Sequence, residues 1–295
     1  MNTEEVNIIK AQNSHQVARI ERNDGMIDYE SSSDLTYNEM ISLSKGLHLM
    51  SEFYDVKAAC SVRGSNVCAV ALGQSLTDAV QKIMDSDPID FISAIIIVSA
   101  EIDSEMARFF KDTNLIVAPK FTQSALEILK AHNVRYVTIN TSLKDYKKYL
   151  SEEIKVTPLG TLVQSPNMSE LVKDSFDVVS KIKPTVEQIE DAVFAWKISK
   201  HIYSQALVIA KDLKTTAIAH GLQSASVEFA LDYSCDMSKD AILASDMPIT
   251  LHDLNVASQG RIKLVIVPSA TKEIIAQADK YEMVLITTGI TNVLY

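Results

Sequence analysis

The sequence predicts an α/β fold built from two similar halves, and three observations lead to this prediction. The chain has 295 residues, enough for one large or two ordinary domains, and 47% of them are apolar, which supplies a substantial core. Glycine and proline are scarce, at 8 and 7 residues, whereas all-β proteins need many tight turns. Helical and buried-strand patterns alternate along the chain, and several landmarks recur at a nearly constant offset.

The first half begins with an amphipathic helix between Leu35 and Tyr54, where apolar residues recur at helical spacing. Residues 56–72 follow as strand, tight loop and strand. A capping-box pattern at Ser75–Asp78 opens a helix that ends at Asp87-Pro88. The later elements are a buried strand at 95–98, a helix at 104–111, a strand at 115–118, a helix at 124–132 and a strand at 136–139. This alternation predicts a largely parallel sheet with helices on its faces.

The second half repeats this pattern after a polar linker, residues 141–184, which contains one predicted strand at 161–164. A long helix is predicted over Val186–Ala210. Ala219-His-Gly221 then repeats Ala71-Leu-Gly73 at an offset of 221 − 73 = 148, and the strands ending in Pro119 and Pro268 differ by 149. Generic α/β order can imitate such a repeat, but we interpret it as an internal duplication. The predicted parts are an N-terminal segment (1–35), a first half (36–157), a linker (158–186) and a second half (187–295).

Charge and cysteine usage exclude several function classes. The net charge is −10 and the pI is about 5.1, which disfavours binding to nucleic acid or an anionic membrane surface. The three cysteines, Cys60, Cys68 and Cys235, show no metal-ligand spacing, so no metal site is predicted. The N-terminus lacks the pattern of a signal peptide, and no apolar run reaches the ~20 residues that span a bilayer. We therefore expect a cytoplasmic protein.

Short strings in both halves resemble one enzyme family. They include Asn13-Ser-His-Gln16, Asn66-Val-Cys68, Phe194-Ala-Trp-Lys-Ile-Ser-Lys-His201, Ser204-Gln-Ala206 and Ala244-Ser-Asp246. In this order they resemble the transformylase part of the AICAR transformylase/IMP cyclohydrolase family, which formylates aminoimidazole carboxamide ribonucleotide (AICAR) with formyl-tetrahydrofolate. The resemblance covers nearly the whole chain. It implies two cytidine-deaminase-like α/β/α halves without zinc, an intertwined homodimer with its site at the interface, and a chain that lacks the cyclohydrolase domain and ends where the family ends.

The sequence departs from the family at positions that carry its chemistry. The Lys-His pair before the Asn-Pro-Cys segment, whose histidine transfers protons, reads Arg63-Gly64 here. Arginine keeps the charge but cannot cycle a proton near neutrality, and glycine has no imidazole. Arginines that bind the substrate phosphate are replaced by Ile9, Ala225 and Thr291. Because bidentate arginine contacts to phosphate are hard to replace, these changes argue against AICAR as the substrate.

The resemblance also assigns candidate site residues, which we expect to line one cleft with two subunits contributing. Arg63, Asn66 and Gln205 would polarise the transferred carbonyl. His220 or Cys68 would replace the missing histidine, although a lone histidine is more often structural and a free cysteine is usually a small buried hydrophobe. The remaining candidates are Asp246 and Ile218 for the folate, and Lys200 and Ser204 for the substrate.

Three functions remain open at this point. The first is transfer of a formyl or related one-carbon group to an amine of a small molecule other than AICAR. The second is a pseudoenzyme that binds a small ligand or a partner chain without catalysis. The third is another reaction in the same cleft, such as a cyclisation, which would need Cys68 or His220.

Overall fold

The computed structural model describes residues 3–8, 10–23, 25–171, 175–221 and 223–295. Its first half opens with helix α1 (Tyr37–Met50), whose N-terminus is closed by a capping box between Thr36 and Glu39. A hairpin of β4 (Lys57–Arg63) and β5 (Asn66–Gly73) follows. The remaining elements are α2 (Leu76–Ser86), α3 (Pro88–Ser93), β6 (Ile95–Val98), α4 (Ser104–Ala107), β7 (Leu115–Ala118), α5 (Gln123–Ala131) and β8 (Arg135–Ile139).

The second half repeats this order of elements. Helix α6 (Val186–Ser199) is followed by the hairpin of β12 (Ala206–Lys211) and β13 (Lys214–His220). The remaining elements are α7 (Gln223–Ser234), β14 (Ile242–Ser245), α8 (Leu251–Gln259), β15 (Leu264–Val267), α9 (Lys272–Lys280) and β16 (Val284–Thr287). Helices α1 and α6 both have 14 residues and begin 186 − 37 = 149 residues apart. The predicted α/β fold of two matching halves is confirmed.

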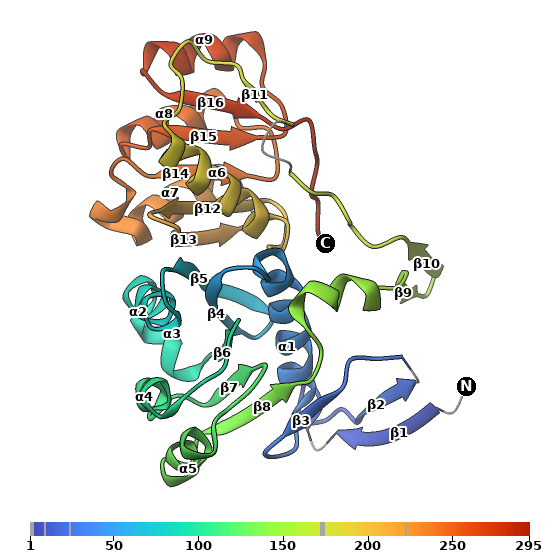
Figure 1. Ribbon diagram of the computed structural model, residues 1–295. Coiled ribbons are helices and arrows are strands. Elements are labelled where there is room, and N and C mark those ends of the chain that lie inside the picture. The colour runs from blue at the N-terminus through green and yellow to red at the C-terminus, as the bar shows by residue number, and fades with distance from the viewer. Residues whose placement is uncertain (1–2, 9, 24, 172–174, 222) are drawn as a thin grey trace.

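These strands form one sheet of twelve, together with the short edge strands β3 (Tyr29–Ser31) and β11 (Asp177–Val178) (Figure 1). The order is β11-β16-β15-β14-β12-β13-β5-β4-β6-β7-β8-β3, so the halves mirror each other about the seam between β13 and β5. Among the strands that the structure describes, parallel pairing is confined to β6–β7–β8 and β14–β15–β16. The prediction of a largely parallel sheet was therefore wrong. Strands joined by a tight turn run antiparallel, and each half carries such a hairpin at the seam.

Helices α1 and α6 lie on one face of the sheet and share a core cluster that continues across the seam. Phe53, after α1, and Phe194 on α6 meet there, with ring centroids 5.6 Å apart. On the other face each half has its own cluster, one beneath α2–α5 and one beneath α7–α9. The halves are thus joined mainly through the sheet and the α1–α6 layer.

Two hairpins lie outside the sheet (Figure 1). Strands β1 (Thr3–Ile8) and β2 (Ala18–Asn23) form the first, and β9 (Glu153–Thr157) and β10 (Gly160–Gln164) form the second. The second hairpin replaces the single strand predicted for the linker. Its apolar side chains are exposed, and Leu159 at its tip is fully so.

One predicted helix was too long. Helix α6 ends at Ser199, and residues 206–210, predicted to continue it, belong to β12. This run is buried throughout, because β12 lies between β13 and β14. A strand buried on both faces is apolar at every position, so periodicity cannot distinguish it from a buried helix. The limits of the predicted linker and halves stay a prediction.

Candidate functional site

A buried carboxylate lies where the hairpin and the parallel strands of the second half meet. Asp246 directly follows β14, and its side chain is fully buried. Its Oδ2 accepts a hydrogen bond from Ser204 Oγ at 2.5 Å, and its Oδ1 accepts one from the Ala206 backbone N–H at 2.8 Å. Burial raises the pKa of the Asp246 carboxyl, and these hydrogen bonds only partly offset the shift. Ser204 Oγ also accepts the Leu294 backbone N–H at 3.0 Å, which ties the C-terminal segment to this point.

Gln205 and His220 belong to the same group of side chains. The Oε1 atom of Gln205 is buried and has no hydrogen-bond partner in the described part of the chain. Its backbone oxygen accepts the Gly221 N–H at 3.2 Å, which holds the end of β13 beside it. The ring of His220 meets that of Tyr203 edge-on, with centroids 6.2 Å apart. Ile218, predicted to touch the cofactor, is half-buried on β13 and packs against the α1–α6 core.

The other predicted catalytic residues form a second group at the turn between β4 and β5. Arg63 pairs through its guanidinium with Asp90 of α3, and the side chain of Asn66 is exposed. Burial, helped by Asp90 and Asp87, raises the pKa of Cys68 to about 12. Because a thiol with this pKa stays protonated near neutrality, the structure gives no support to Cys68 as a nucleophile. Among the described residues, no hydrogen bond or ion pair joins this group to Gln205 or Asp246.

The second group contains the one set of side chains in the described ranges that meets a metal-ligand geometry. One ligand atom each of Cys68, Asp87 and Asp90 lies within 4.8 Å of the others. Arg63 already neutralises Asp90, and Asp87 Oδ1 accepts the Asp90 backbone N–H as the N-cap of α3. Both carboxylates, of Asp87 and Asp90, therefore already have partners within the protein.

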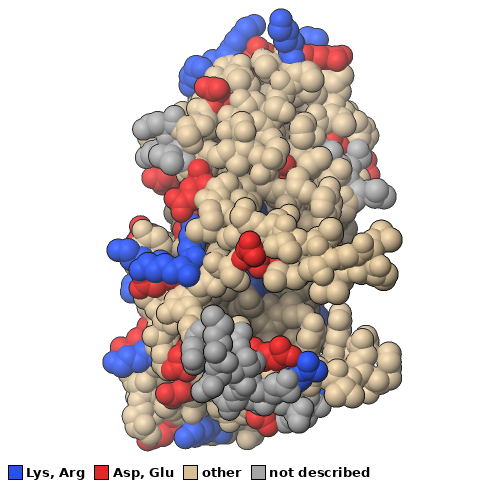
Figure 2. Space-filling view, turned by 90° about the vertical axis from the view of Figure 1, so that its right-hand side faces the viewer, with Lys and Arg blue, Asp and Glu red and all other residues tan. Residues whose placement is uncertain are grey.

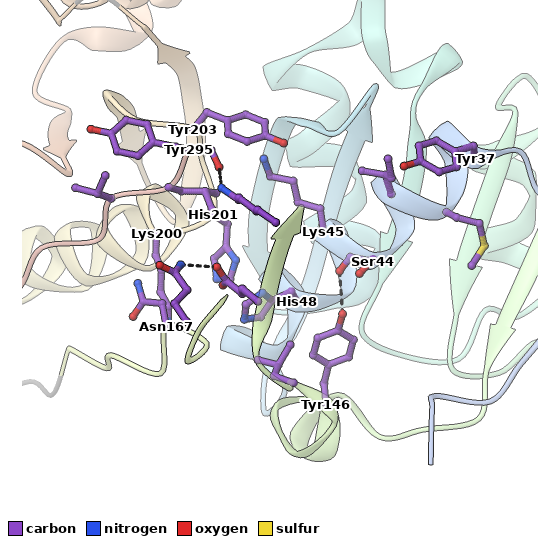
Figure 3. A pocket seen from close by; sticks show the side chains of 18 of the residues that line it. Tyr37, Ser44, Lys45, His48, Tyr146, Asn167, Lys200, His201, Tyr203 and Tyr295 are labelled. Carbon is purple, nitrogen blue, oxygen red and sulfur yellow. Dashed lines mark hydrogen bonds between the residues drawn. The ribbon is translucent and has the colours of Figure 1, made fainter. Parts of the chain in front are cut away.

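A cavity of about 890 Å³ opens beside the first group, on the α1 side of the sheet. Its walls come from α1, from the two outer hairpins, from residues 200–203 and from the C-terminal segment. Figure 2 faces this side of the molecule and shows the surface hollowed between the outer segments. Figure 3 shows Lys45 of α1 and Tyr203 reaching toward each other from opposite walls, and Lys45 Nζ lies 3.7 Å from the centroid of the Tyr203 ring.

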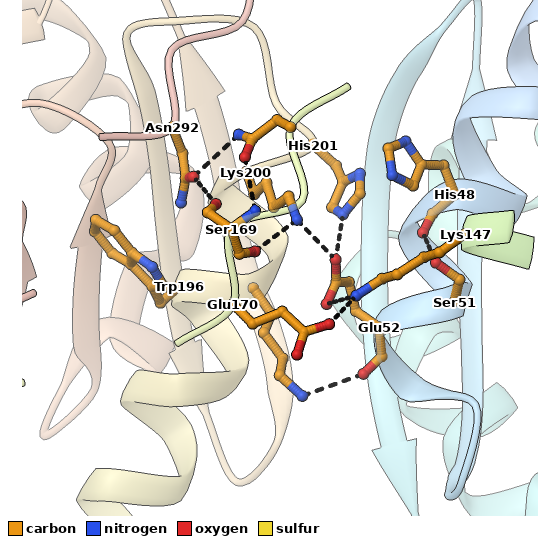
Figure 4. Close-up of polar contacts among 12 residues, drawn as sticks. His48, Ser51, Glu52, Lys147, Ser169, Glu170, Trp196, Lys200, His201 and Asn292 are labelled. Atoms are coloured by element: carbon orange, nitrogen blue, oxygen red, sulfur yellow. Dashed lines mark hydrogen bonds and ion pairs between the residues drawn. The ribbon is translucent and has the colours of Figure 1, made fainter. Parts of the chain in front are cut away.

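Lys200, predicted to bind substrate, lies at the edge of this cavity but is committed to a buried ion cluster (Figure 4). Its Nζ lies 3.2 Å from Glu52 Oε1 and donates to the Ser169 carbonyl at 2.8 Å. Lys147 Nζ lies 3.3 Å from Glu52 Oε2, and His201 Nε2 lies 3.5 Å from Glu52 Oε1. Burial raises the pKa of Glu52, but His201, Lys200 and Lys147 outweigh it and hold this pKa well below its usual range.

Sequence reasoning missed Glu52, although the duplication contains a signal for it. Adding the offset of 149 between α1 and α6 to position 52 gives 201, so Glu52 and His201 occupy equivalent positions in the two halves. Residues that are equivalent under a two-fold relation can meet only near its axis. The observed contact of Glu52 with His201 therefore places this pair of positions near the axis.

The fold and this site define an α/β protein of two matching halves with a polar site at the strand ends of the second half. The sequence family described as AICARFT/IMPCHase bienzyme matches residues 5–232. The chain is 32% identical over 292 residues to the bifunctional purine biosynthesis protein PurH of Fusobacterium nucleatum subsp. nucleatum, which covers 93% of this chain and 56% of that protein. It is 32% identical over 268 residues to PurH of Caldicellulosiruptor saccharolyticus, covering 88% and 51%.

The chain therefore belongs to the AICARFT/IMPCHase family and is AICAR-transformylase-like, as the sequence motifs predicted. It spans about half the length of the curated relatives it matches. No helix within the described ranges is both long and apolar enough to cross a membrane.

Proposed function

We propose that the chain transfers a formyl or related one-carbon group, carried by formyl-tetrahydrofolate, to an amine of a small molecule other than AICAR. The observation that carries this proposal is the buried Oε1 of Gln205 near Asp246, for which the described residues supply no hydrogen-bond partner. A buried acceptor left without a partner costs about 1–3 kcal/mol, and the N–H of an amine substrate would satisfy it. Family membership supports the reaction class.

The residues suggest how the transfer would proceed. The amine nitrogen attacks the formyl carbon, a C–N bond forms, and the bond from that carbon to the folate nitrogen breaks. The attacking amine loses a proton, for which His220 is the candidate base, and the leaving folate nitrogen gains one. The Gln205 side-chain amide orients the amine, and Arg63 and Asn66 would stabilise the developing oxyanion. Because these two belong to the other group of side chains, this proposal requires two copies of the chain to complete one site.

The test measures folate binding and formyl transfer for matched variants. Gln205→Leu should lose transfer while Gln205→Asn, which keeps the amide, retains part of it. Gln123→Leu, at an exposed position of helix α5, should change neither folate binding nor transfer. Asp246→Ala should weaken folate binding by about 1–3 kcal/mol in calorimetry. If the unmodified chain binds no folate, the cofactor role is rejected.

The pseudoenzyme is the second candidate, because Gly64 replaces the family's histidine and Arg63 is held by Asp90. Losing a general acid/base costs roughly 10²–10⁴-fold in rate. Both candidates predict that AICAR is formylated very slowly or not at all. Turnover of AICAR within about tenfold of an ordinary transformylase, or roughly 1.4 kcal/mol in barrier, would contradict both.

A further inference from the structure

The cavity beside α1 contains a lysine that lacks an anionic partner. Lys45 is half-buried, and in the described part of the chain no hydrogen bond or ion pair is found for its Nζ, which lies over the Tyr203 ring. The other cations of this cavity are occupied. Lys200 pairs with Glu52, Lys155 donates to the Tyr295 backbone oxygen at 2.5 Å, and Arg19 pairs with Glu21.

Holding a half-buried ammonium without a counter-ion costs free energy, and this cost appears as a lowered pKa. Burial lowers the pKa of Lys45 to about 8. An anion bound in the cavity would reverse this effect, because an opposite charge within about 4–6 Å favours the charged form of the lysine. The Lys45 ammonium is therefore a candidate partner for a bound anion.

The polar groups around Lys45 limit the charge of its partner. His48, one turn further along α1, has a buried Nε2 with no hydrogen-bond partner among the described residues. Burial, together with His201 and Lys200, lowers the pKa of His48 to about 3, so its ring is neutral and offers a hydrogen bond without a second charge. A phosphate dianion is usually held by several cations or a bidentate arginine, whereas the other cations of this wall, Lys200, Lys155 and Arg19, already have partners.

Part of the remaining lining is aromatic and apolar, and Glu21, Glu153, Gln164 and Asn167 lie elsewhere along the wall. The rings of Tyr37 and Tyr146 and the side chains of Met40, Ile41 and Val293 contribute to it (Figure 3). The Tyr146 hydroxyl is already used, donating to the Ser44 carbonyl at 3.0 Å. Ligand pockets of about 300–1,000 Å³ with mainly apolar walls and a few fixed polar groups are typical of small-molecule sites.

We propose that this cavity is a binding site for an aromatic monocarboxylate, whose carboxylate pairs with Lys45 and accepts a hydrogen bond from His48. The ring of the ligand then lies against the tyrosines and aliphatic side chains of the wall. This site differs from the group around Asp246, although Tyr203 borders the cavity and Ser204 binds Asp246. The proposal concerns binding and stands whether or not the chain transfers a formyl group.

Calorimetry with phenylacetate as the probe tests the proposal, with phenylacetamide as its neutral counterpart. Phenylacetate should bind the unmodified chain at least about tenfold more tightly than phenylacetamide, since hydrogen bonds to charged groups contribute about 1.5–3 kcal/mol. Lys45→Met, which keeps the length of the side chain, should remove this preference, and Lys45→Arg should retain it. Lys130→Met on α5 is the matched control, because Lys130 is exposed and does not line the cavity.

Each contrary result is decisive. Equal binding of the acid and the amide, or unchanged phenylacetate binding by a folded Lys45→Met variant, overturns the ion pair. Tighter binding of inorganic phosphate than of phenylacetate overturns the ligand class. No binding of phenylacetate at millimolar concentration rejects the small-molecule site, including the case in which a segment of a second copy fills the cavity. Circular dichroism of each variant verifies that it is folded.

Discussion

Replacing Glu52 by glutamine tests whether the buried ion cluster joins the two halves. The Glu52 carboxylate follows α1 in the first half, and two of its partners, Lys200 and His201, follow α6 in the second. Only 5% of each of the Glu52 and Lys200 side chains is exposed. Glutamine has nearly the same shape but no charge, so the substitution changes electrostatics more than packing.

The size of the stability loss depends on the charges that remain after the substitution. Lys147 keeps an ion pair to Glu170 at 2.7 Å, but Lys200 retains only the Ser169 carbonyl for a buried ammonium. Removing one partner of a buried pair typically costs about 3–5 kcal/mol, because the other charge remains uncompensated. We expect Glu52→Gln to lower the free energy of unfolding by about this amount near neutral pH.

The pH dependence supplies a second readout. The pKa of Glu52 lies well below its ordinary value of 4.5 in the folded chain, so its contribution to stability is fully present above about pH 4.5. It is lost as the pH falls through the folded pKa, because the unfolded chain binds the proton first. The stability difference between the unmodified chain and Glu52→Gln should therefore be constant from about pH 5 to 7 and should shrink at lower pH.

Urea unfolding followed by circular dichroism measures the effect, and Glu170→Gln is the matched control. Glu170 also pairs with Lys147, but 63% of its side chain is exposed, and exposed pairs contribute about 0–1 kcal/mol. Glu52→Gln combined with Lys200→Met, which removes both charges, should recover much of the lost stability. A loss below about 1 kcal/mol for Glu52→Gln alone would refute the reasoning, since the cluster would then behave like a surface ion pair.

Three further experiments test glycine packing, cysteine reactivity and the pH dependence of stability. Gly73→Ala should destabilise the fold by at least about 1–3 kcal/mol in urea unfolding, because its Cβ would lie 2.5 Å from the Ala79 backbone nitrogen and 2.6 Å from the Ser75 oxygen. Gly46→Ala should cost less, since its closest contact is the flexible tip of Ile97; an equal cost contradicts the argument. Iodoacetamide should modify exposed Cys235 well before Cys68, whose pKa is about 12, and peptide mass spectrometry would show the reverse order if Cys68 were a thiolate. His48→Gln should flatten the loss of stability between pH 6.5 and about 3, because the folded chain keeps His48 neutral while the unfolded chain protonates it; an unchanged slope rules out this contribution.

Much of the fold could be predicted because its signals are local. Ser75 and Thr122 cap α2 and α5 through their side chains, and the run Ile95–Val98 is apolar at each position of a buried strand. The predicted end of a helix at Asp87-Pro88 matches the end of α2, but the same residues also start α3, with Asp87 as N-cap and Pro88 in the first turn. A sequence pattern that ends one helix does not show whether another helix begins at the next residue.

The site was less predictable, because its groups depend on contacts between distant parts of the chain. Two separate strings assigned Ser204 to the substrate and Asp246 to the folate, and these two side chains touch although they are 42 positions apart. Their roles stay a prediction. Nothing local indicates that Arg63 pairs with Asp90, since that contact depends on the helix that the sequence did not predict. Lys45 resembles a solvated lysine on an amphipathic helix, and only the outer hairpins and residues 200–203 turn its surroundings into a cavity.

The two halves differ at the centre of the molecule, and charge explains why a buried acid there has no acidic counterpart. Near a two-fold relation, a side chain meets its own counterpart from the other half, and position 52 meets position 201 here. Two glutamates would repel in a buried place, and two protonated histidines would do the same. An acid in one half and a histidine in the other form a complementary pair, and Lys200 and Lys147 then complete the neutralisation of Glu52. A duplicated chain with a buried acid at its axis therefore requires the halves to diverge at that position, which links the stability of the fold to the asymmetry of its two halves.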